Sequence, residues 1–573
     1  MAIEESFMKA LFHGAIAEDM VLPWPEPGKD EREHTGLLLE GLRTFAARAI
    51  DPARIDREGA IPEEVIVGLR ERGVFGLNIP QEYGGRGLSA TATARVIQEL
   101  AGVDASVAVT VAAHLTLGAM GLLQFGTEAQ KRSYLPRMAR GELIGAFALT
   151  EPGTGSDAGA LQTRADRAAD GDGYALHGAK SWVTNGGRAG LFTVFARTTA
   201  RDGNSKPRIT ALLVERADGV RVGDEPRRLG LRGATIPDVF FDGLRVPSAR
   251  VLGDAGRGFK VAMEVLNAGR VALAAGCLGA CRRIIKLSIE RCAERRAFGR
   301  PIGEFGMVRD KVARMVADSF ALESMTYLTT GLRDARVPDF SLESAICKVF
   351  GSEVLWRTAS EGLQIAASAG YVEGHPAERI LRDARVNLIF EGTSEILRAF
   401  IALSGMQGPG RTLDEAGRAM REPIKGFGLL SDFVLRKARS ALGRERLNRA
   451  HPSLRHETVL FEEYTVMLSK NVDKVLRRHG KDIAEMQYTQ RRMADVAIDL
   501  FALVACLSRT TRAIERKGEE GARREVELTA AFANAAEKRL QANVTAFDAN
   551  DDELLKGIAA QAYQDGAYPF DVL

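Results

Sequence analysis

Cysteine is scarce in this sequence, with five residues in a chain of 573. An odd number of widely spaced cysteines argues against a disulfide framework and predicts a reducing compartment, with the cytoplasm as the default. Cys277 and Cys281 stand one helical turn apart, but no further Cys or His lies nearby to complete a metal site. We therefore expect small core residues there and no metal.

The chain also lacks an excess of charge and a long apolar run. Its 78 Lys and Arg against 75 Asp and Glu leave a net charge of only +3, so no field of the whole protein attracts nucleic acid. No stretch of 18 consecutive apolar residues predicts a membrane span, and Glu4 and Glu5 near the start do not fit a targeting peptide. The 45% hydrophobic and 27% charged residues are typical of a folded protein of several domains.

What the sequence does contain is helical periodicity on both sides of a β-pattern. Apolar residues recur at helical spacing up to about residue 143, apart from a Gly/Pro-rich loop over 79–88; alternation then predicts strands to about 251, and helices return after 258. A Gly/Pro-rich break at Gly405–Leu413 is interpreted as a boundary. The predicted domains are 1–145 (helical), 146–255 (β), 256–405 (helical bundle) and 406–573 (additional helical).

The segment FALTEPGTGSD, Phe147–Asp157, is the most informative stretch. Gly153 and Gly155 could begin a dinucleotide fingerprint, but a strand pattern follows where that motif needs a helix, so we reject a Rossmann site. The glycines and Ser156 can instead form an irregular loop whose N–H groups and hydroxyls approach a polar cofactor closely. An ordinary β-turn is the alternative.

Three further stretches carry candidate chemistry, each with a structural alternative. Trp182, with Thr184, can form a cofactor wall or lie in the core. The segment RRAFGRPIGEF, Arg295–Phe305, offers guanidinium groups for a phosphate and Phe298 for a planar ring, or is a solvated basic helix end. Glu391, between an apolar run and a glycine, is either a structural carboxylate or a base whose pKa is raised by desolvation.

In this order and spacing the four stretches resemble the acyl-CoA dehydrogenase family, and most closely its very-long-chain subfamily. The resemblance covers nearly the whole chain and includes FGLNIPQEYGGRGL, AKSWVTNGGRAGLFTVFART, FFDGLRVPSARVLGDAGRGFKVAMEVLNAGR and AERILRDARVNLIFEGTSEILR. The late block Gln490–Ile514 is similar to the extra C-terminal domain of that subfamily. The implied fold is mainly α: an N-terminal helical domain, a β-barrel-like domain, a four-helix bundle and an additional helical domain.

The resemblance also implies a function. We expect FAD-dependent α,β-dehydrogenation of long or very long fatty acyl-CoA to trans-2-enoyl-CoA in β-oxidation, with an electron-transfer flavoprotein as acceptor and a homodimeric enzyme. A flavin oxidase or monooxygenase of the same fold, and a non-enzymatic assembly scaffold, are the alternatives. An absorbance spectrum with dye-linked activity, with and without oxygen, separates the three.

The resemblance assigns roles to individual residues. Glu391 matches the catalytic base; some relatives carry that base at the position matched here by Gly269, which has no side chain to accept a proton. The expected substrate contacts are Ser156, Asn267, Arg270 and Gly392. The expected FAD contacts are Phe147, Leu149, Thr150, Gly155, Ser156, Trp182, Val183, Thr184, Arg295, Phe298, Phe305, Gln364, Ala367, Ser368, Thr393 and Glu395. Of these, Arg295 and Phe305 match positions that reach the partner subunit's FAD.

Three further features of the sequence bear on FAD binding, acyl chain length and membrane contact. The sequence reads Ala366-Ala367-Ser368-Ala369-Gly370 where the family has Gly-Gly-x-Gly, and each added methyl limits how closely backbone approaches a phosphate, which bears on FAD retention. Ala108, Ala112 and Ala113 either leave room for a long acyl tail or allow close helix packing. Residues 425–449 suggest a basic amphipathic helix on the inner face of a membrane, or one packed on its own domain.

Overall fold

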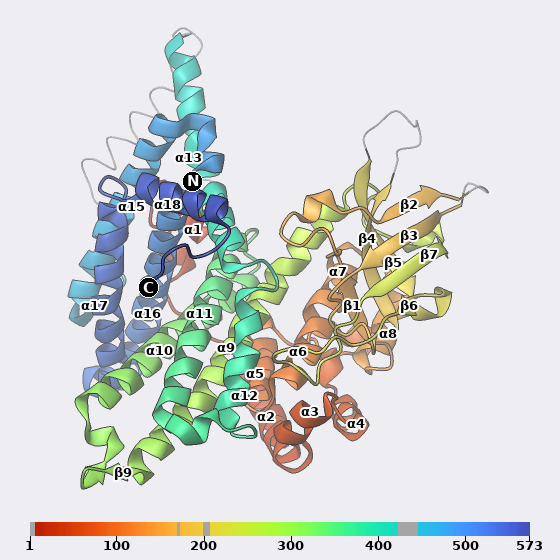
Figure 1. Cartoon of the computed structure of the whole chain (residues 1–573), viewed down its shortest axis with the longest axis horizontal. Helices are drawn as coiled ribbons and strands as arrows, with labels where there is room; N and C mark the ends of the chain where they lie inside the picture. The colour runs from red at the N-terminus through yellow and green to blue at the C-terminus, as the bar shows by residue number, and fades with distance from the viewer. Residues whose placement is uncertain (1–5, 169–171, 199–206, 422–444, 573) are drawn as a thin grey trace. The chain divides into compact units, whose positions relative to one another are not determined.

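The computed structural model describes residues 6–168, 172–198, 207–421 and 445–572. The chain divides into two compact units, one of residues 20–397 and one that combines residues up to 19 with those from 398 onward. Most of the helix predicted at 425–449 falls on residues 422–444, which lie outside the described part of the chain, so this helix stays a prediction. The main sheet falls between two helical stretches of the sequence, as the periodicity predicts, and Figure 1 shows it with a separate short strand, β9, elsewhere.

The first part of the larger unit is helical, as expected. Its α-helices are α2 (Lys29–Ala49), α3 (Pro52–Glu58), α4 (Glu63–Glu71), α5 (Ala90–Ala101), α6 (Ala105–Ala113), α7 (Met120–Phe125) and α8 (Glu128–Ala139). Phe45, Phe75 and Leu100 lie in one apolar core with buried residues of α6. The core therefore fixes α6, whose alanines the sequence analysis connects with the acyl chain.

A mixed sheet of eight strands follows (Figure 1). Its strands are β1 (Gly145–Ala148), β2 (Arg164–Arg167), β3 (Tyr174–Lys180), β4 (Leu191–Thr198), β5 (Arg208–Glu215), β6 (Arg221–Val222), β7 (Val239–Val246) and β8 (Val251–Leu252). The order is β6-β7-β3-β2-β4-β5-β8, and β1 pairs parallel to β4. Because β1 and β3 both end beside the same part of the sheet, the loops that leave them come close together.

Strand β4 joins the sheet to the helices because both of its faces are buried. Phe192 and Val194 lie in the core of the sheet itself. Leu191 and Phe195 pack in a second core with helix residues such as Val265. This two-sided burial matches the nearly continuous apolar sequence of the strand and makes sheet and helices one unit.

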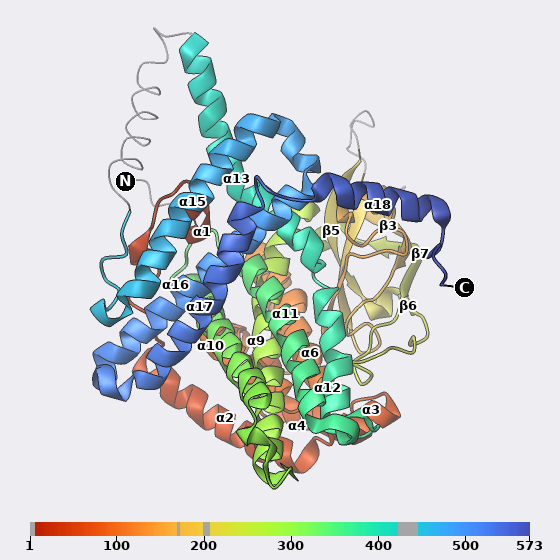
Figure 2. The ribbon, with the colours of Figure 1, turned by 60° about the vertical axis from the view of Figure 1, so that its left-hand side comes forward.

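Three long helices and a short one follow in the larger unit: α9 (Gly258–Glu294), α10 (Gly306–Asp334), α11 (Ser341–Ala366) and the shorter α12 (Pro376–Arg385). Figure 2 shows α9, α10 and α11 side by side. Between α9 and α10 a small hairpin pairs β9 (Arg296–Ala297) with β10 (Arg300–Pro301). Helix α12 leads into the loop that carries Glu391.

The smaller unit is helical throughout its described part. It contains α1 (Phe7–Phe12), most of α13 (Ser394–Arg421), α15 (Arg455–His479), α16 (Gln487–Gly521), α17 (Arg523–Thr545) and α18 (Asp552–Asp565). Asp499 of α16 accepts a 2.6 Å hydrogen bond from Arg539 of α17, which fixes these two helices against each other.

The Gly/Pro-rich stretch Gly405–Leu413 is not a loop, because α13 runs through it, and the domain boundary predicted there stays a prediction. A Cβ at Gly405 would come within 2.4 Å of the Phe12 ring, and one at Gly408 within 2.5 Å of His13. These glycines therefore allow α1 to approach α13 closely. Sequence alone cannot distinguish such packing glycines from glycines of a loop.

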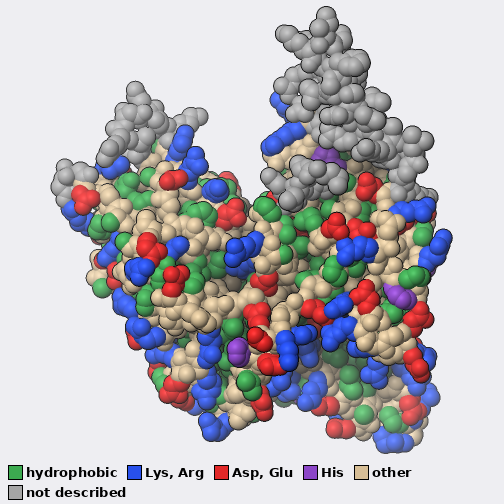
Figure 3. Space-filling view, turned by 180° about the vertical axis from the view of Figure 1, so that it is seen from behind, with side chains coloured by type: hydrophobic (Ala, Val, Ile, Leu, Met, Phe, Trp, Pro, Cys, Tyr) green, Lys and Arg blue, Asp and Glu red, His purple; other side chains and the backbone are tan. Residues whose placement is uncertain are grey.

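Two helical stretches, Ala105–Phe125 and Gly258–Glu294, are long and apolar enough to span a membrane. In both, 78% of the apolar window is buried inside the protein, as expected for core helices. Among the described residues no group of three or more His, Cys, Asp or Glu could hold a metal ion. In Figure 3 basic and acidic side chains are interspersed, in agreement with the small net charge.

Candidate active site

Glu391 lies at a sharp turn between α12 and α13. Its φ is 58° and that of Gly392 is 96°, so two consecutive residues have left-handed backbone. This conformation is uncommon for a residue with a side chain and is retained mainly where function requires it. The carboxylate oxygen Oε2 is buried and has no hydrogen-bond partner. A buried, unpaired carboxylate oxygen is costly, which argues against a purely structural role.

Helix α9 makes room for this carboxylate at Gly269. A Cβ on Gly269 would lie 2.7 Å from Glu391 Oε2 and 3.0 Å from Oε1. Any side chain at this position would therefore displace the carboxylate. Gly269 has no side chain that could act as the base, and the same absence leaves the space that the Glu391 carboxylate occupies.

Two buried cations hold the turn around Glu391. Arg270 Nε donates to the backbone carbonyl of Glu391 at 3.3 Å, and Lys348 Nζ from α11 donates to that of Gly392 at 2.7 Å. Arg270 is 7% exposed and also donates to Asn267 Oδ1 at 3.2 Å. Three of the expected substrate contacts, Asn267, Arg270 and Gly392, therefore lie close together. Lys348 was not identified from the sequence, because its position within an apolar helix gives no local signal.

The environment of Glu391 sets its protonation. Burial raises the pKa of its carboxyl from 4.5 to about 7, although Arg270 and Lys348 both favour the charged form. Burial likewise lowers the pKa of Lys348 to about 8, so this ammonium remains charged at neutral pH. A carboxylate with a pKa close to 7 is well matched to the work of a general base at neutral pH.

The predicted flavin segments after β1 and β3 lie side by side. Ser181 N donates to the carbonyl of Thr150 at 2.9 Å, which joins the loop of Thr150 and Ser156 to the segment of Trp182 and Thr184. Phe147 and Leu149 are partly buried and pack against the helix–sheet core, so they form the base of this region. Gly155 is exposed, and a Cβ there would meet nothing within 4 Å.

Trp182 is 59% exposed and has a φ of 57°, so the interpretation as a core residue is wrong. Val183, buried beside it, donates its N–H to the carbonyl of Pro237 at 3.1 Å. Asn185 donates from Nδ2 to the carbonyl of Thr110 in α6 at 2.9 Å. This buried amide, missed in the sequence analysis, connects the predicted flavin segment to the helix of the predicted acyl site.

The segment between residues 231 and 237 also reaches the helix before Glu391. Leu231 N donates to Asp383 Oδ1 of α12 at 2.6 Å, and Asn185 N donates to the carbonyl of Thr235 at 2.8 Å. Burial raises the pKa of Asp383 to about 7. One short loop thus connects the segment of Trp182 with the helix that leads to the base.

The other predicted FAD contacts form a second group at the β9–β10 hairpin and the end of α11. Phe298 and Phe305 form an edge-to-face pair at 6.0 Å, and Phe298 is 94% exposed. Ile365 of α11 packs with Cys292 and Met315, next to Ile302, which directly follows the hairpin. This packing brings exposed Gln364, Ala367 and Ser368 near exposed Arg295.

The structure does not bring the two groups together within one chain. Figures 1 and 2 place β9 at the far end of the helices from the sheet that carries β1 and β3. Thr393 and Glu395 belong to neither group: Thr393 Oγ1 caps α13 by accepting from Ile396 N at 3.3 Å, and Glu395 is exposed.

These residues fit FAD in their geometry. A planar ring needs an exposed apolar surface beside polar groups, and Trp182 provides one next to Thr184. In the 149–163 loop, the buried Oγ1 of Thr154 has no hydrogen-bond partner. Space is open above Gly153 and Gly155. Ala367 fits less well: it has φ 55° and ψ −143°, a conformation that favours glycine.

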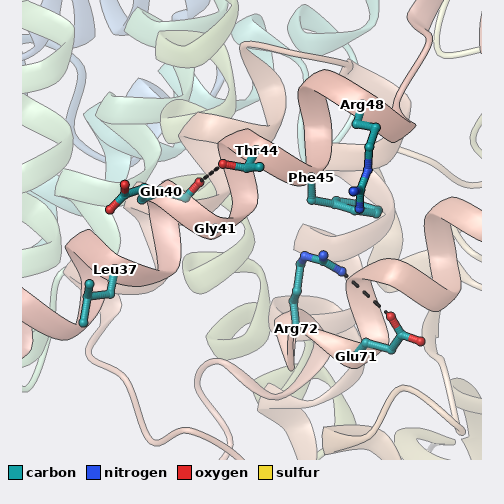
Figure 4. Close-up of a pocket in the computed structure, with 8 residues that line it drawn as sticks. All are labelled: Leu37, Glu40, Gly41, Thr44, Phe45, Arg48, Glu71 and Arg72. Atoms are coloured by element: carbon teal, nitrogen blue, oxygen red, sulfur yellow. Dashed lines mark hydrogen bonds and ion pairs between the residues drawn. The ribbon is translucent and has the colours of Figure 1, made fainter.

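A surface hollow between α2 and α4 is a separate feature (Figure 4). It is lined by Leu37, Glu40, Gly41, Thr44, Phe45, Arg48, Glu71 and Arg72. Arg72 lies over the ring of Phe45 at 4.2 Å, which partly closes the hollow. None of the residues assigned to flavin, substrate or catalysis lines it.

Comparison with known proteins covers most of the chain. Residues 32–142, 146–244 and 256–406 match the N-terminal, middle and C-terminal domains of acyl-CoA dehydrogenases, and residues 452–568 match the ACAD9/ACADV C-terminal domain. The mitochondrial very long-chain specific acyl-CoA dehydrogenase of Homo sapiens is 38% identical over 96% of this chain and 85% of its own length.

Solved structures give the same result. An acyl-CoA dehydrogenase of Bacillus anthracis complexed with FAD superposes with a TM-score of 0.81 at 26% identity, covering 98% of this chain and 96% of that one. A chain from a structure titled as the electron transferring flavoprotein of Acidaminococcus fermentans has a TM-score of 0.62 at 32% identity, covering 67% of this chain and 99% of that one.

Proposed function

The chain belongs to the acyl-CoA dehydrogenase family, and from that premise we propose that it oxidises long or very long fatty acyl-CoA with Glu391 as the base. It is an FAD-dependent oxidoreductase that acts on the CH–CH group of fatty acyl-CoA in β-oxidation. The observation that carries the assignment of the base is the buried carboxylate oxygen Oε2 of Glu391, which has no hydrogen-bond partner and faces Gly269.

The residues of this chain account for the proton transfer. Glu391 accepts the α-proton, and its pKa of about 7 leaves a substantial fraction ionised at neutral pH. Arg270 and Lys348 hold the two carbonyls of the turn, so the backbone that carries the carboxylate stays in place. A bound acyl chain excludes water from the site and raises the basicity of the carboxylate further. FAD, held by the segments of Thr150 and Trp182, supplies the acceptor for the β-hydride.

A preference for long acyl chains rests on two observations. The relative with 38% identity is named as very long-chain specific. In α6, Ala108 packs in the helical core, whereas Ala112 is only half-buried and lies outside that core, so Ala112 is the alanine available to an acyl tail. Each further CH₂ that is buried stabilises the complex by about 0.8 kcal/mol.

A series of acyl-CoA substrates tests the function. We expect dye-linked activity with kcat/KM rising from butyryl-CoA to palmitoyl-CoA or longer, and we expect Ala112→Phe to lower the value for palmitoyl-CoA more than that for butyryl-CoA. Ala105→Phe, on a half-buried position of the same helix, is the control. A wild-type maximum at butyryl- or hexanoyl-CoA would contradict long-chain preference, and rapid turnover with oxygen alone would favour an oxidase.

We also propose a homodimer and an electron-transfer flavoprotein as acceptor. The separation of the two predicted FAD groups in one chain supports the dimer, because a second copy can supply the residues around exposed Phe298. The likeness to the chain from the electron transferring flavoprotein structure supports the acceptor. A cytoplasmic location and membrane contact by residues 425–449 remain predictions.

A further inference from the structure

A buried ion pair lies behind the predicted flavin loop, at a place to which neither the motif comparison nor the mechanism gives a role. Lys180, the last residue of β3, is 0% exposed, and Glu151 is 7% exposed. Lys180 Nζ donates to Glu151 Oε1 at 2.7 Å. An ion pair this deeply buried brings little net stability compared with apolar residues of similar volume, so its presence calls for another reason.

The pair is connected to backbone at both ends of one loop. Lys180 Nζ also donates to the carbonyl of Leu149 at 3.0 Å. Glu151 accepts from Gln162 N at 2.5 Å through Oε2 and from Thr163 N at 2.8 Å through Oε1. The two side chains therefore join the start of the 149–163 loop, its end and the end of β3.

These bonds determine which way the loop presents its polar groups. In a trans peptide the carbonyl and the following N–H point in opposite directions. Because the carbonyl of Leu149 points inward to Lys180, the N–H of Thr150 points outward, away from the ammonium. The carbonyl of Thr150 accepts from Ser181 N at 2.9 Å, so the same arrangement positions the segment that leads to Trp182.

The charge state of the pair is consistent with this arrangement. Burial lowers the pKa of Lys180 to about 8, while Glu151 opposes that shift. The pKa of Glu151 is lowered, because the hydrogen bonds from Lys180, Thr163 and Gln162 together outweigh the effect of burial. Both groups are therefore ionised at neutral pH, and four hydrogen bonds depend on them.

We propose that Lys180 and Glu151 are positioning residues that set the 149–163 loop and the adjoining segment of Trp182 in the conformation that binds FAD. The proposal rests on the assigned FAD-dependent function. It predicts that loss of either charge weakens FAD binding specifically. Lys180→Met keeps the length of the side chain but leaves the carbonyl of Leu149 without its donor and Glu151 without its counter-ion.

The test is titration of apoprotein with FAD, together with visible circular dichroism of the bound flavin and thermal unfolding. We expect Lys180→Met to raise the FAD dissociation constant at least about tenfold and to change the dichroism. Arg250→Met is the control: it removes a partly buried cation of the same β-region, which donates to Glu215 at 3.0 Å away from the loop. For Arg250→Met we expect a lower melting temperature than that of wild type but an FAD affinity close to that of wild type.

Each outcome decides the question. Affinity of Lys180→Met within about threefold of wild type, or an equal loss in Arg250→Met, overturns the proposal. If Lys180→Met does not fold, Glu151→Gln, which keeps the volume and one acceptor, takes its place and is expected to weaken binding in the same way; wild-type affinity there overturns the proposal. Wild-type protein that binds no FAD would contradict the assigned function instead.

Discussion

Glu391 combines two features that cost free energy: left-handed backbone at φ 58° and a buried carboxylate oxygen without a partner. Each is expected to destabilise the fold by about 1–3 kcal/mol. Arg270 and Lys348 offset part of this cost, since both bind carbonyls of the same turn. At the residue scale, the site is therefore a strained turn held in place by its surroundings.

The raised pKa of Glu391 predicts opposite effects of pH on activity and stability. A base must be ionised, so kcat/KM rises with pH through about 7. The native state binds the proton more tightly than the unfolded state, whose pKa is near 4.5, so the free energy of unfolding falls between pH 4.5 and about 7. Denaturant unfolding of apoprotein should find Glu391→Gln equal to wild type at pH 4.5 and more stable at pH 8. An equal difference at both pH values would contradict the shift.

The backbone conformation of Ala367 predicts that replacing this residue by glycine stabilises the protein. Its φ of 55° and ψ of −143° cost about 1–3 kcal/mol for alanine, whereas the extra freedom of glycine in the unfolded chain costs about 0.4–1 kcal/mol. Ala367→Gly should therefore raise the free energy of unfolding, by about 1 kcal/mol, and tighten FAD binding. Ala369→Gly in the same loop is the control and should lower stability slightly. A loss of stability in Ala367→Gly would contradict the assigned strain.

At the scale of elements, α9 and α11 carry the groups that fix the base. Gly269 and Arg270 come from α9 and Lys348 from α11, and the two helices pack along much of their length. The turn of Glu391 is thus positioned by two helices that are far apart in sequence. Small errors in their packing would be transmitted directly to the carboxylate.

Lys348→Met tests this positioning role. Loss of the ammonium leaves the carbonyl of Gly392 unpaired and removes a charge that lowers the pKa of Glu391. We expect kcat to fall at least about tenfold and the apparent pKa in the kcat/KM profile to rise above about 7. The exposed Lys286→Met serves as control and should leave the profile unchanged. An unchanged pKa in Lys348→Met would rule out the proposed coupling.

Elements with strong periodicity were predictable, and short or closely packed ones were not. The long helices and the four strands of seven or eight residues, β3, β4, β5 and β7, follow from apolar spacing. Strands β6 and β8 have 2 residues each, too few for a period to show. At Gly405 the composition indicated a break, but the contact with Phe12, distant in sequence, decides the conformation.

Across the whole molecule, the motifs point to the candidate site but not to the groups that hold it. Glu391, Trp182 and Arg270 lie in recognisable segments. Lys348, Lys180 and Asn185 act through contacts with backbone more than 25 residues away, and such contacts leave no local pattern. The proposed second copy of the chain is likewise outside the reach of periodicity.

We propose that this FAD enzyme uses Glu391 to start the oxidation of fatty acyl-CoA. Anaerobic mixing of FAD-loaded protein with palmitoyl-CoA, followed by flavin absorbance, measures this step directly. We predict rapid bleaching of the flavin in wild type and in the control Glu373→Gln, which changes an exposed residue. Glu391→Gln should still bind flavin, but this flavin should bleach at least about 10²-fold more slowly. Bleaching of Glu391→Gln at more than about a tenth of the wild-type rate would show that another group removes the proton.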